Sequence, residues 1–249
     1  MSTTTMMDRI AGASPHSQSR MAGVIALITT TTGFASVVRG QLVVYWNASA
    51  TAHNILSHDL LFRLAFVGDI IGLLYIVYAL LLYNLFKPVN RSLSVLAVTF
   101  SLVGSTIQGL NCVFQFAPLI ILGGSQSLSA FNTDQLQALA LMFLKFYDQG
   151  YNINMVLFGT YNLLIGYLIF RSTFLPRVLG VLLAISGLCY LVNCFSGFIS
   201  PAFETHLVPY ILIPGAAELL LALWLVAIGV NGQRWNEQAA ASGFRRTAQ

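Results

Sequence analysis

The chain has 249 residues, of which 57% are hydrophobic and only 8% are charged. Because a soluble globular domain carries about 25% charged residues, this composition excludes a soluble domain and predicts a helical protein that crosses a membrane several times. The net charge of +4 does not indicate a nucleic-acid-binding surface, because the basic residues are scattered over short turns and tails instead of forming a stripe.

Six apolar stretches are each long enough to cross a hydrocarbon core about 30 Å thick. They lie at residues 21–43, 60–86, 93–118, 150–170, 178–199 and 209–230. We therefore expect an all-α fold, a polytopic membrane helical bundle of six transmembrane helices whose main partner is the lipid bilayer. The transmembrane domain is expected to cover residues 21–230, between polar cytoplasmic tails at 1–20 and 231–249.

The first apolar stretch has a competing interpretation as the core of a cleaved signal peptide, since Arg9 and Arg20 precede it. However, the run from Met21 to Val38 is rich in threonine and is longer than a typical signal-peptide core. These features favour a helix that is retained in the membrane.

The region from Asp134 to Phe170 is too long for a single span, because its 37 residues would extend about 55 Å as a helix. Its beginning carries a helix-capping signal at Thr133 and Asp134. We therefore expect residues 134–147 to form an amphipathic helix on the outer surface, or a protruding extension of the fourth span. The sequence leaves both alternatives open.

The basic residues set the expected orientation, since cytoplasmic loops of membrane proteins are enriched in Lys and Arg. With the N-terminus in the cytoplasm, nine of the 12 basic residues lie on the cytoplasmic side: Arg9, Arg20, Lys87, Arg91, Arg171, Arg177, Arg234, Arg245 and Arg246. Only Arg39, Arg63 and Lys145 lie outside. We therefore expect both termini to be cytoplasmic.

The central functional feature is Asp69, half-way along the second span, because a carboxylate at that depth is costly and normally has a partner. Glu218 lies at a matching depth in the sixth span, and both acids are about 14 Å below the outer surface. We expect them to face a common polar cavity in the outer half of the bundle, with Arg39 as their counter-ion. The cavity is expected to be lined or closed by Arg39, Arg63, Gln108, Asn111, Gln115, Asp148, Asn152 and Asn193.

Two further patterns bear on this cavity. Pro214 is expected to kink the sixth helix beside it and to free the carbonyl of Tyr210, because proline has no backbone N–H. The outer loops contain His53, His58, Glu204 and His206, but without the spacing of a zinc site. We expect no metal and no cofactor.

Four stretches carry a family resemblance: NRSLSVLAVTFSLVG, GYNINMVLFGTYNLLIGYLIFRSTFLPRVLGVLLAISGLCYLVN, PGAAELLLALWLVAIGV and ATAHNILSHDLLFRLAFVGDII. Over roughly residues 20–230 the chain resembles a bacterial integral membrane family catalogued only as a domain of unknown function. The resemblance implies six helices in a bacterial inner membrane and brings no established activity. The chain departs from the family pattern at TFSLVGSTIQG, where an arginine is expected beside Leu-Val-Gly.

Three functions are compatible with these patterns. The favoured one is a protein that binds, and could transport, a small or lipidic molecule in an outward-facing polar cavity. The alternative is an intramembrane enzyme that uses Asp69 and Glu218 as acid and base on a lipidic or isoprenoid substrate. The third is an assembly or regulatory membrane subunit, in which the polar residues are ordinary contacts between helices.

Overall fold

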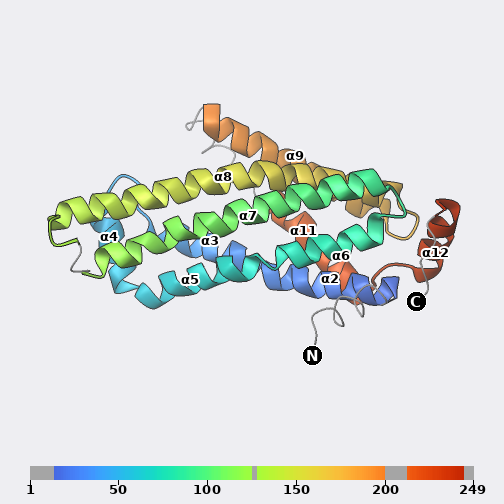
Figure 1. Cartoon of the computed structure of the whole chain (residues 1–249), viewed down its shortest axis with the longest axis horizontal. Helices are drawn as coiled ribbons and strands as arrows, with labels where there is room; N and C mark the ends of the chain where they lie inside the picture. The colour runs from blue at the N-terminus through green and yellow to red at the C-terminus, as the bar shows by residue number, and fades with distance from the viewer. Residues whose placement is uncertain (1–13, 125–127, 200–211, 244–249) are drawn as a thin grey trace. The chain divides into compact units, whose positions relative to one another are not determined.

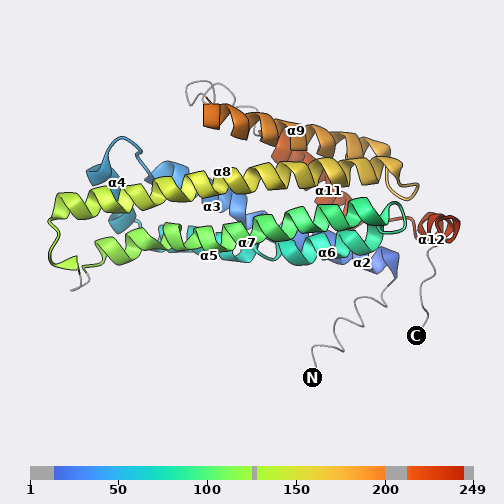
Figure 2. The same cartoon turned by 45° about the horizontal axis from the view of Figure 1, so that its top comes forward.

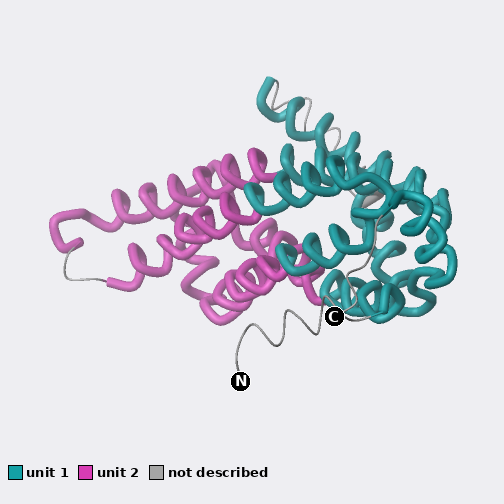
Figure 3. Tube along the Cα trace, turned by 45° about the vertical axis from the view of Figure 1, so that its right-hand side comes forward, with its two compact units in different colours: residues 1–27, 75–104, 155–249 teal, residues 28–74, 105–154 magenta. Residues whose placement is uncertain are grey.

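A computed structural model describes residues 14–124, 128–199 and 212–243, and the regular secondary structure of this part of the chain is entirely helical (Figure 1). The chain divides into two compact units, coloured separately in Figure 3. Unit 1 comprises residues 1–27, 75–104 and 155–249, and unit 2 comprises residues 28–74 and 105–154. Each unit has a hydrophobic core of its own. The fold class is therefore the expected one.

The first span consists of two helices, α2 (Pro15–Thr29) and α3 (Thr31–Leu42), which are interrupted at Thr30 (Figure 1). Helix α2 begins before residue 21, so part of the expected polar tail is helical. Proline is well suited to the first position of a helix, and the hydroxyl of Ser14 accepts a hydrogen bond from the backbone N–H of Ser17. The capping residues thus explain the earlier start.

The second span is also interrupted. Helix α5 (Asp59–Gly72) and helix α6 (Tyr75–Phe86) are separated at Leu73 and Leu74, whose N–H groups bond to carbonyls three residues back in a tight 3₁₀-like turn. A short helix, α4 (Ala48–Ser57), lies between the first two spans. The breaks in both spans fall close to the points where the chain passes from one unit to the other.

The third and fourth spans are unusually long. Helix α7 (Arg91–Leu122) has 32 residues and helix α8 (Thr133–Arg171) has 39, whereas about 20 suffice to cross a bilayer. Residues 134–147 are helical and continuous with the fourth span, so they form an extension of it and not a separate helix. In unit 2 the second half of α7 lies beside the first half of α8 (Figures 1 and 2).

The start of α8 shows why the extension folds as a helix. Asn132 and Gln135 form reciprocal bonds, in which each side-chain oxygen accepts from the backbone N–H of the other residue, at 2.9 and 3.0 Å. One face of the extension is then buried, with Leu141 and Leu144 in the core of unit 2 beside Phe62. The expected amphipathic character is confirmed.

The fifth span is α9 (Arg177–Ile199), and the described part of the sixth is α11 (Leu212–Ala227). The start of the expected sixth span and the carbonyl of Tyr210 lie outside the described residues. The sixth span turns by 101° into α12 (Gly232–Ala241). Among the described residues, five helical stretches are long and apolar enough to cross a membrane, or six if this bent pair is one span. The chain is thus a multi-pass membrane protein.

Glycines bring α8 and α9 of unit 1 close together. A Cβ atom at Gly166 would lie 2.7 Å from the carbonyl oxygen of Gly180, and one at Gly159 would lie 2.9 Å from that of Gly187. Small residues at helix interfaces allow such an approach of two backbones in a membrane. The close approach places Asn162 of α8 opposite Ser186 of α9, a pair that belongs to the site described below.

Candidate functional site

Asp69 lies where α3 and α5 pack most closely in unit 2. The interface is made of small side chains: a Cβ at Gly68 would lie 3.0 Å from the carbonyl oxygen of Thr31, and the Thr31 hydroxyl donates to the Gly68 carbonyl at 3.2 Å. Arg39 lies about two turns after Thr31 on α3. Its side chain reaches Asp69, the residue that follows Gly68 on α5. The small residues at this interface thus let the two helices approach closely enough for the ion pair to form.

The ion pair is almost completely buried. Nη1 of Arg39 lies 2.5 Å from Oδ2 of Asp69, and the two side chains are only 7% and 1% exposed. Nη2 of Arg39 donates to the hydroxyl of Ser36 at 3.0 Å, and the guanidinium carbon lies 4.5 Å from the centre of the Tyr147 ring. Arg39 therefore forms an ion pair with Asp69, one of the two acids whose counter-ion it was expected to be. Removing either partner would leave a buried charge uncompensated.

Tyr147 connects this pair to α7. Its hydroxyl donates to Oδ2 of Asp69 at 3.0 Å and accepts from the amide of Gln108 at 3.2 Å, while its backbone carbonyl accepts from Asn111 at 2.7 Å. The Gln108 oxygen in turn accepts from Asn154 at 3.4 Å. We refer to Ser36, Arg39, Asp69, Gln108, Asn111, Gln115, Tyr147 and Asn154 as the Asp69 network.

Gln115 is the exception within the network. Its side chain is 0% exposed and its amide interacts with the Asp69 carboxylate, yet neither amide atom has a hydrogen bond of good geometry to the described residues. Oδ1 of Asn111 also lacks a partner among them and packs against Gly150, where a Cβ would overlap the Asn111 side chain. The network thus has unused polar atoms at its centre.

Glu218 has a different environment in unit 1. Its Oε1 accepts from the amide of Asn162 at 2.8 Å and lies 3.4 Å from the hydroxyl of Ser186, and Tyr190 also hydrogen-bonds to its carboxylate. No ion pair among the described residues includes Glu218. The Ser186 hydroxyl lies a further 3.4 Å from the carbonyl oxygen of Pro214. Glu218 is therefore held by neutral groups only.

Aromatic rings surround this second acid. The ring of Tyr75 packs against those of Tyr78, Phe158 and Tyr161, with centroids 5.0, 5.1 and 5.6 Å away, and Phe158 packs against Tyr190 at 5.4 Å. Most of these contacts are edge-to-face or tilted, the arrangements that aromatic pairs prefer. Glu218 therefore lies among neutral polar groups and aromatic rings.

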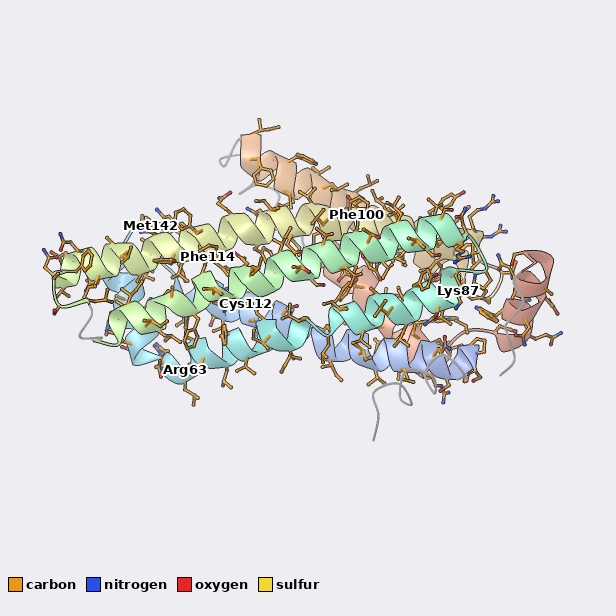
Figure 4. The ribbon with its side chains drawn as sticks, viewed as in Figure 1. Arg63, Lys87, Phe100, Cys112, Phe114 and Met142 are labelled. Atoms are coloured by element: carbon orange, nitrogen blue, oxygen red, sulfur yellow. The ribbon has the colours of Figure 1, made fainter. Side chains whose placement is uncertain are left out.

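Four of the residues expected to line the cavity are placed elsewhere or are not joined to the Asp69 network by a described hydrogen bond. Arg63 pairs with Asp59 at 2.8 Å on an exposed part of α5 (Figure 4). Asp148 accepts a hydrogen bond from Tyr45, and partial burial together with this carboxylate raises the pKa of the Tyr45 phenol. Asn152 and Asn193 are half-buried.

The expected common cavity of Asp69 and Glu218 stays a prediction. Each acid has its own set of partners within its own unit, and Asp69 is closed off from the surface. Two pockets among the described residues lie elsewhere. One of about 580 Å³ in unit 2 is lined by residues such as His53, Leu122 and Gln137, and one of about 480 Å³ in unit 1 includes His16 and Arg20.

Comparison with known proteins places the chain in a family. Residues 21–229 match the family described as Domain of unknown function (DUF4386). The chain belongs to this family. It is also similar to an uncharacterized protein from Archaeoglobus fulgidus, with 26% identity over 168 residues, which is 68% of this chain and 83% of that protein. No solved structure matches.

Several residues of the two sites of this DUF4386 protein were not singled out from the sequence: Ser36, Tyr147, Asn162, Ser186 and Tyr190. Tyr147 lies seven residues before Asn154, on the same face of α8, so its helical phase was a usable signal. Asn162 is a polar side chain deep within an apolar span, which was a second signal. Ser186 gave none, because serine is common in membrane helices.

Proposed function

We propose that this DUF4386 protein binds a small polar molecule, or the polar end of a lipid, at the Asp69 network inside its membrane domain. Gln115 carries the proposal, because its amide is fully buried and, apart from its interaction with the Asp69 carboxylate, has no well-formed hydrogen bond among the described residues. Leaving a buried polar group without a partner costs about 1–3 kcal/mol. A bound molecule that completes the hydrogen bonds of the Gln115 amide would remove this cost.

The free atoms indicate the chemistry of the ligand. The Gln115 amide offers both a donor and an acceptor, and Oδ1 of Asn111 offers a second acceptor. Arg39 and Asp69 neutralise each other, so the network does not demand a charged ligand. The proposed ligand is therefore neutral at its polar end and presents at least one hydroxyl or amide group.

The helix breaks support an extension of this proposal to transport. A ligand reaches the closed network only if the helices around it move. The second span is interrupted at Leu73–Leu74, a few residues after Asp69, and the first span is interrupted at Thr30, on the same span as Arg39. Interrupted helices beside a polar binding site are typical of secondary transporters. The breaks give α3 and α5 a place to bend.

The alternative of an intramembrane enzyme gains less support. It requires Asp69 and Glu218 to act on one substrate, but each acid is hydrogen-bonded to a separate set of neighbours. Asp69 is in addition engaged in a buried ion pair with Arg39, so its carboxylate is already occupied. A protein that binds a ligand without catalysing a reaction explains the same buried polar residues with fewer assumptions.

The test is the substitution Gln115→Leu, with Gln41→Leu on the exposed side of α3 as a matched control. The proteins are purified from native membranes, and both the co-purifying molecules and the thermal unfolding of the ligand-free protein are measured. We expect Gln115→Leu to lose the bound molecule and to stabilise the ligand-free protein by about 1–3 kcal/mol, because the unpaired amide is gone. The control should do neither.

Two results would contradict the proposal. If the wild-type protein carries no molecule that the Gln115→Leu protein lacks, the network is not a binding site. If the leucine variant is less stable than the wild type by a similar amount, the amide makes structural hydrogen bonds and is not reserved for a ligand.

We further propose that the protein lies in the inner membrane of a bacterium with both termini in the cytoplasm. The distribution of basic residues supports this orientation. In unit 1 the backbone N–H of Val230, at the end of the sixth span, also donates to the Ser19 hydroxyl near the start of α2 at 3.1 Å, which supports both ends of the chain lying on one side. The exposed pair Ser92→Cys and Ser49→Cys tests it in a cysteine-free background. A membrane-impermeant maleimide added from outside should label only the Ser49→Cys protein. Labelling of the Ser92→Cys protein would indicate the opposite orientation.

A further inference from the structure

We propose that the oxygen atoms around Glu218 in unit 1 form a binding site for a monovalent metal cation, specifically Na⁺. The site consists of the Glu218 carboxylate, the Ser186 hydroxyl and the Pro214 carbonyl, with Asn162 and Tyr190 bonded to the carboxylate. It shares no residue with the Asp69 network, so it does not depend on the ligand proposed there.

Helix geometry explains why these atoms converge. Ser186 and Tyr190 are four residues apart on α9, and Pro214 and Glu218 are four residues apart on α11, so each pair lies on one face of its helix. The two helices pack against each other within unit 1. Asn162 enters from α8, which the glycine contacts hold close to α9.

The spacing of the oxygens fits a cation better than a hydrogen-bonded cluster. The Ser186 oxygen is 3.4 Å from both the Pro214 carbonyl oxygen and the Glu218 Oε1, whereas a good O–H···O bond is about 2.7–2.8 Å long. One hydroxyl proton also cannot serve both acceptors. Oxygens that surround a cation at about 2.4 Å and at right angles lie about 3.4 Å apart, whereas Mg²⁺, at about 2.0–2.1 Å, needs them about 2.9 Å apart.

The charge of the site selects a monovalent ion. Among the described residues the site has one carboxylate, and its other oxygens are neutral, so one positive charge balances it. Ca²⁺ has a similar size to Na⁺ but usually takes several carboxylates. No group of three or more His, Cys, Asp or Glu side chains that could hold a metal occurs among the described residues. A lone carboxylate in a membrane-spanning helix is costly, and a bound Na⁺ removes that cost.

The nearby tyrosines do not favour an organic cation instead. Recognition of an ammonium group needs open ring faces. The rings of Tyr75, Tyr78 and Tyr161 pack edge-to-face against one another at 5.0 and 5.6 Å, so these faces already contact aromatic neighbours. The rings provide an apolar environment beside the oxygen site. The low local dielectric constant strengthens the electrostatic attraction between the site and a small ion.

The experiment measures thermal unfolding of the full-length protein in detergent while NaCl replaces N-methylglucamine chloride at constant ionic strength. We expect a saturable rise in the unfolding midpoint of about 3–6 °C when Na⁺ is tenfold above its dissociation constant. Glu218→Gln and Ser186→Ala should each abolish or strongly weaken this rise. Ser196→Ala is the matched control, since the Ser196 hydroxyl donates to the Val192 carbonyl of its own helix and, in the part of the chain that the structure describes, makes no bond to the Glu218 site.

Two outcomes would overturn the proposal. The midpoint does not change when Na⁺ replaces the bulky cation, or it responds to pH and not to Na⁺, in which case Glu218 carries a proton. Should Glu218→Gln not fold, Ser186→Ala decides alone, because it keeps the carboxylate and removes one ligand. An unchanged Na⁺ response in that variant would contradict the assigned oxygens. A lost response in Gln115→Leu would instead connect Na⁺ to the Asp69 network.

Discussion

Asp69 in unit 2 and Glu218 in unit 1 are both acids in membrane-spanning helices, and they are accommodated in opposite ways. Asp69 has a buried arginine at 2.5 Å and a tyrosine hydroxyl at 3.0 Å. Glu218 has an amide, two hydroxyl groups and no cation among the described residues. The protein therefore supplies a counter-charge for Asp69 from its own side chains, whereas in our proposal a bound cation supplies it for Glu218.

This difference separates a fixed polar centre from an exchangeable one. A buried ion pair holds its members in one geometry, because either charge alone would be strongly destabilising. A carboxylate among neutral donors instead changes its state whenever a cation arrives or leaves. We therefore assign recognition of a neutral ligand to the Asp69 network and cation dependence to the Glu218 site. The predictions below test whether the two acids really differ.

The largest effect is expected for Asp69→Asn. The substitution leaves the Arg39 guanidinium buried without a counter-charge, and removing one member of a buried ion pair costs about 3–5 kcal/mol. Chemical or thermal unfolding of the purified protein in detergent measures this loss. The double substitution Arg39→Met with Asp69→Leu should recover most of the stability, because it removes both charges and keeps the volume. A double variant that is no better than Asp69→Asn would contradict the ion-pair interpretation.

An intermediate effect is expected for Tyr147→Phe. The change removes the hydroxyl that donates to Asp69 and accepts from Gln108, and hydrogen bonds to charged groups are worth about 1.5–3 kcal/mol. Tyr167→Phe is the control, because Tyr167 is 48% exposed and its change should stay within about 0.5 kcal/mol. The same unfolding measurement applies. Equal effects of both variants would show that Tyr147 acts through bulk and not through its hydroxyl.

The ion pair could be predicted because depth and charge are properties of a single helix. Asp69 and Arg39 each lie at a countable distance along a span, and a buried carboxylate requires a cation. The polar stripe of α7 was equally visible, since Gln108, Asn111 and Gln115 recur at helical spacing. These parts of the site follow from local pattern and electrostatics.

The separate hydrogen-bond partners of the two acids could not be predicted in the same way. Their matching depth suggested one shared cavity, but depth does not determine how a helix is rotated or which neighbour it faces. The glycine contact between α8 and α9 decides that Asn162 and Ser186 bond to Glu218. The break at Leu73–Leu74 has no proline before it in the second span but directly follows Gly72, where a Cβ would overlap the Thr32 side chain.

The smallest effect is expected for Glu218→Gln in sodium-free buffer. The amide has nearly the same shape and keeps an oxygen to accept from Asn162 and Ser186, and the change leaves no opposite charge behind, because none is paired with Glu218 among the described residues. The free energy of unfolding should therefore change by no more than about 1 kcal/mol, in either direction. Added NaCl should then widen the gap, because the wild type gains stability and the variant does not. A loss as large as that of Asp69→Asn would mean that Glu218 has a fixed cation of its own, and the two acids would no longer differ in kind.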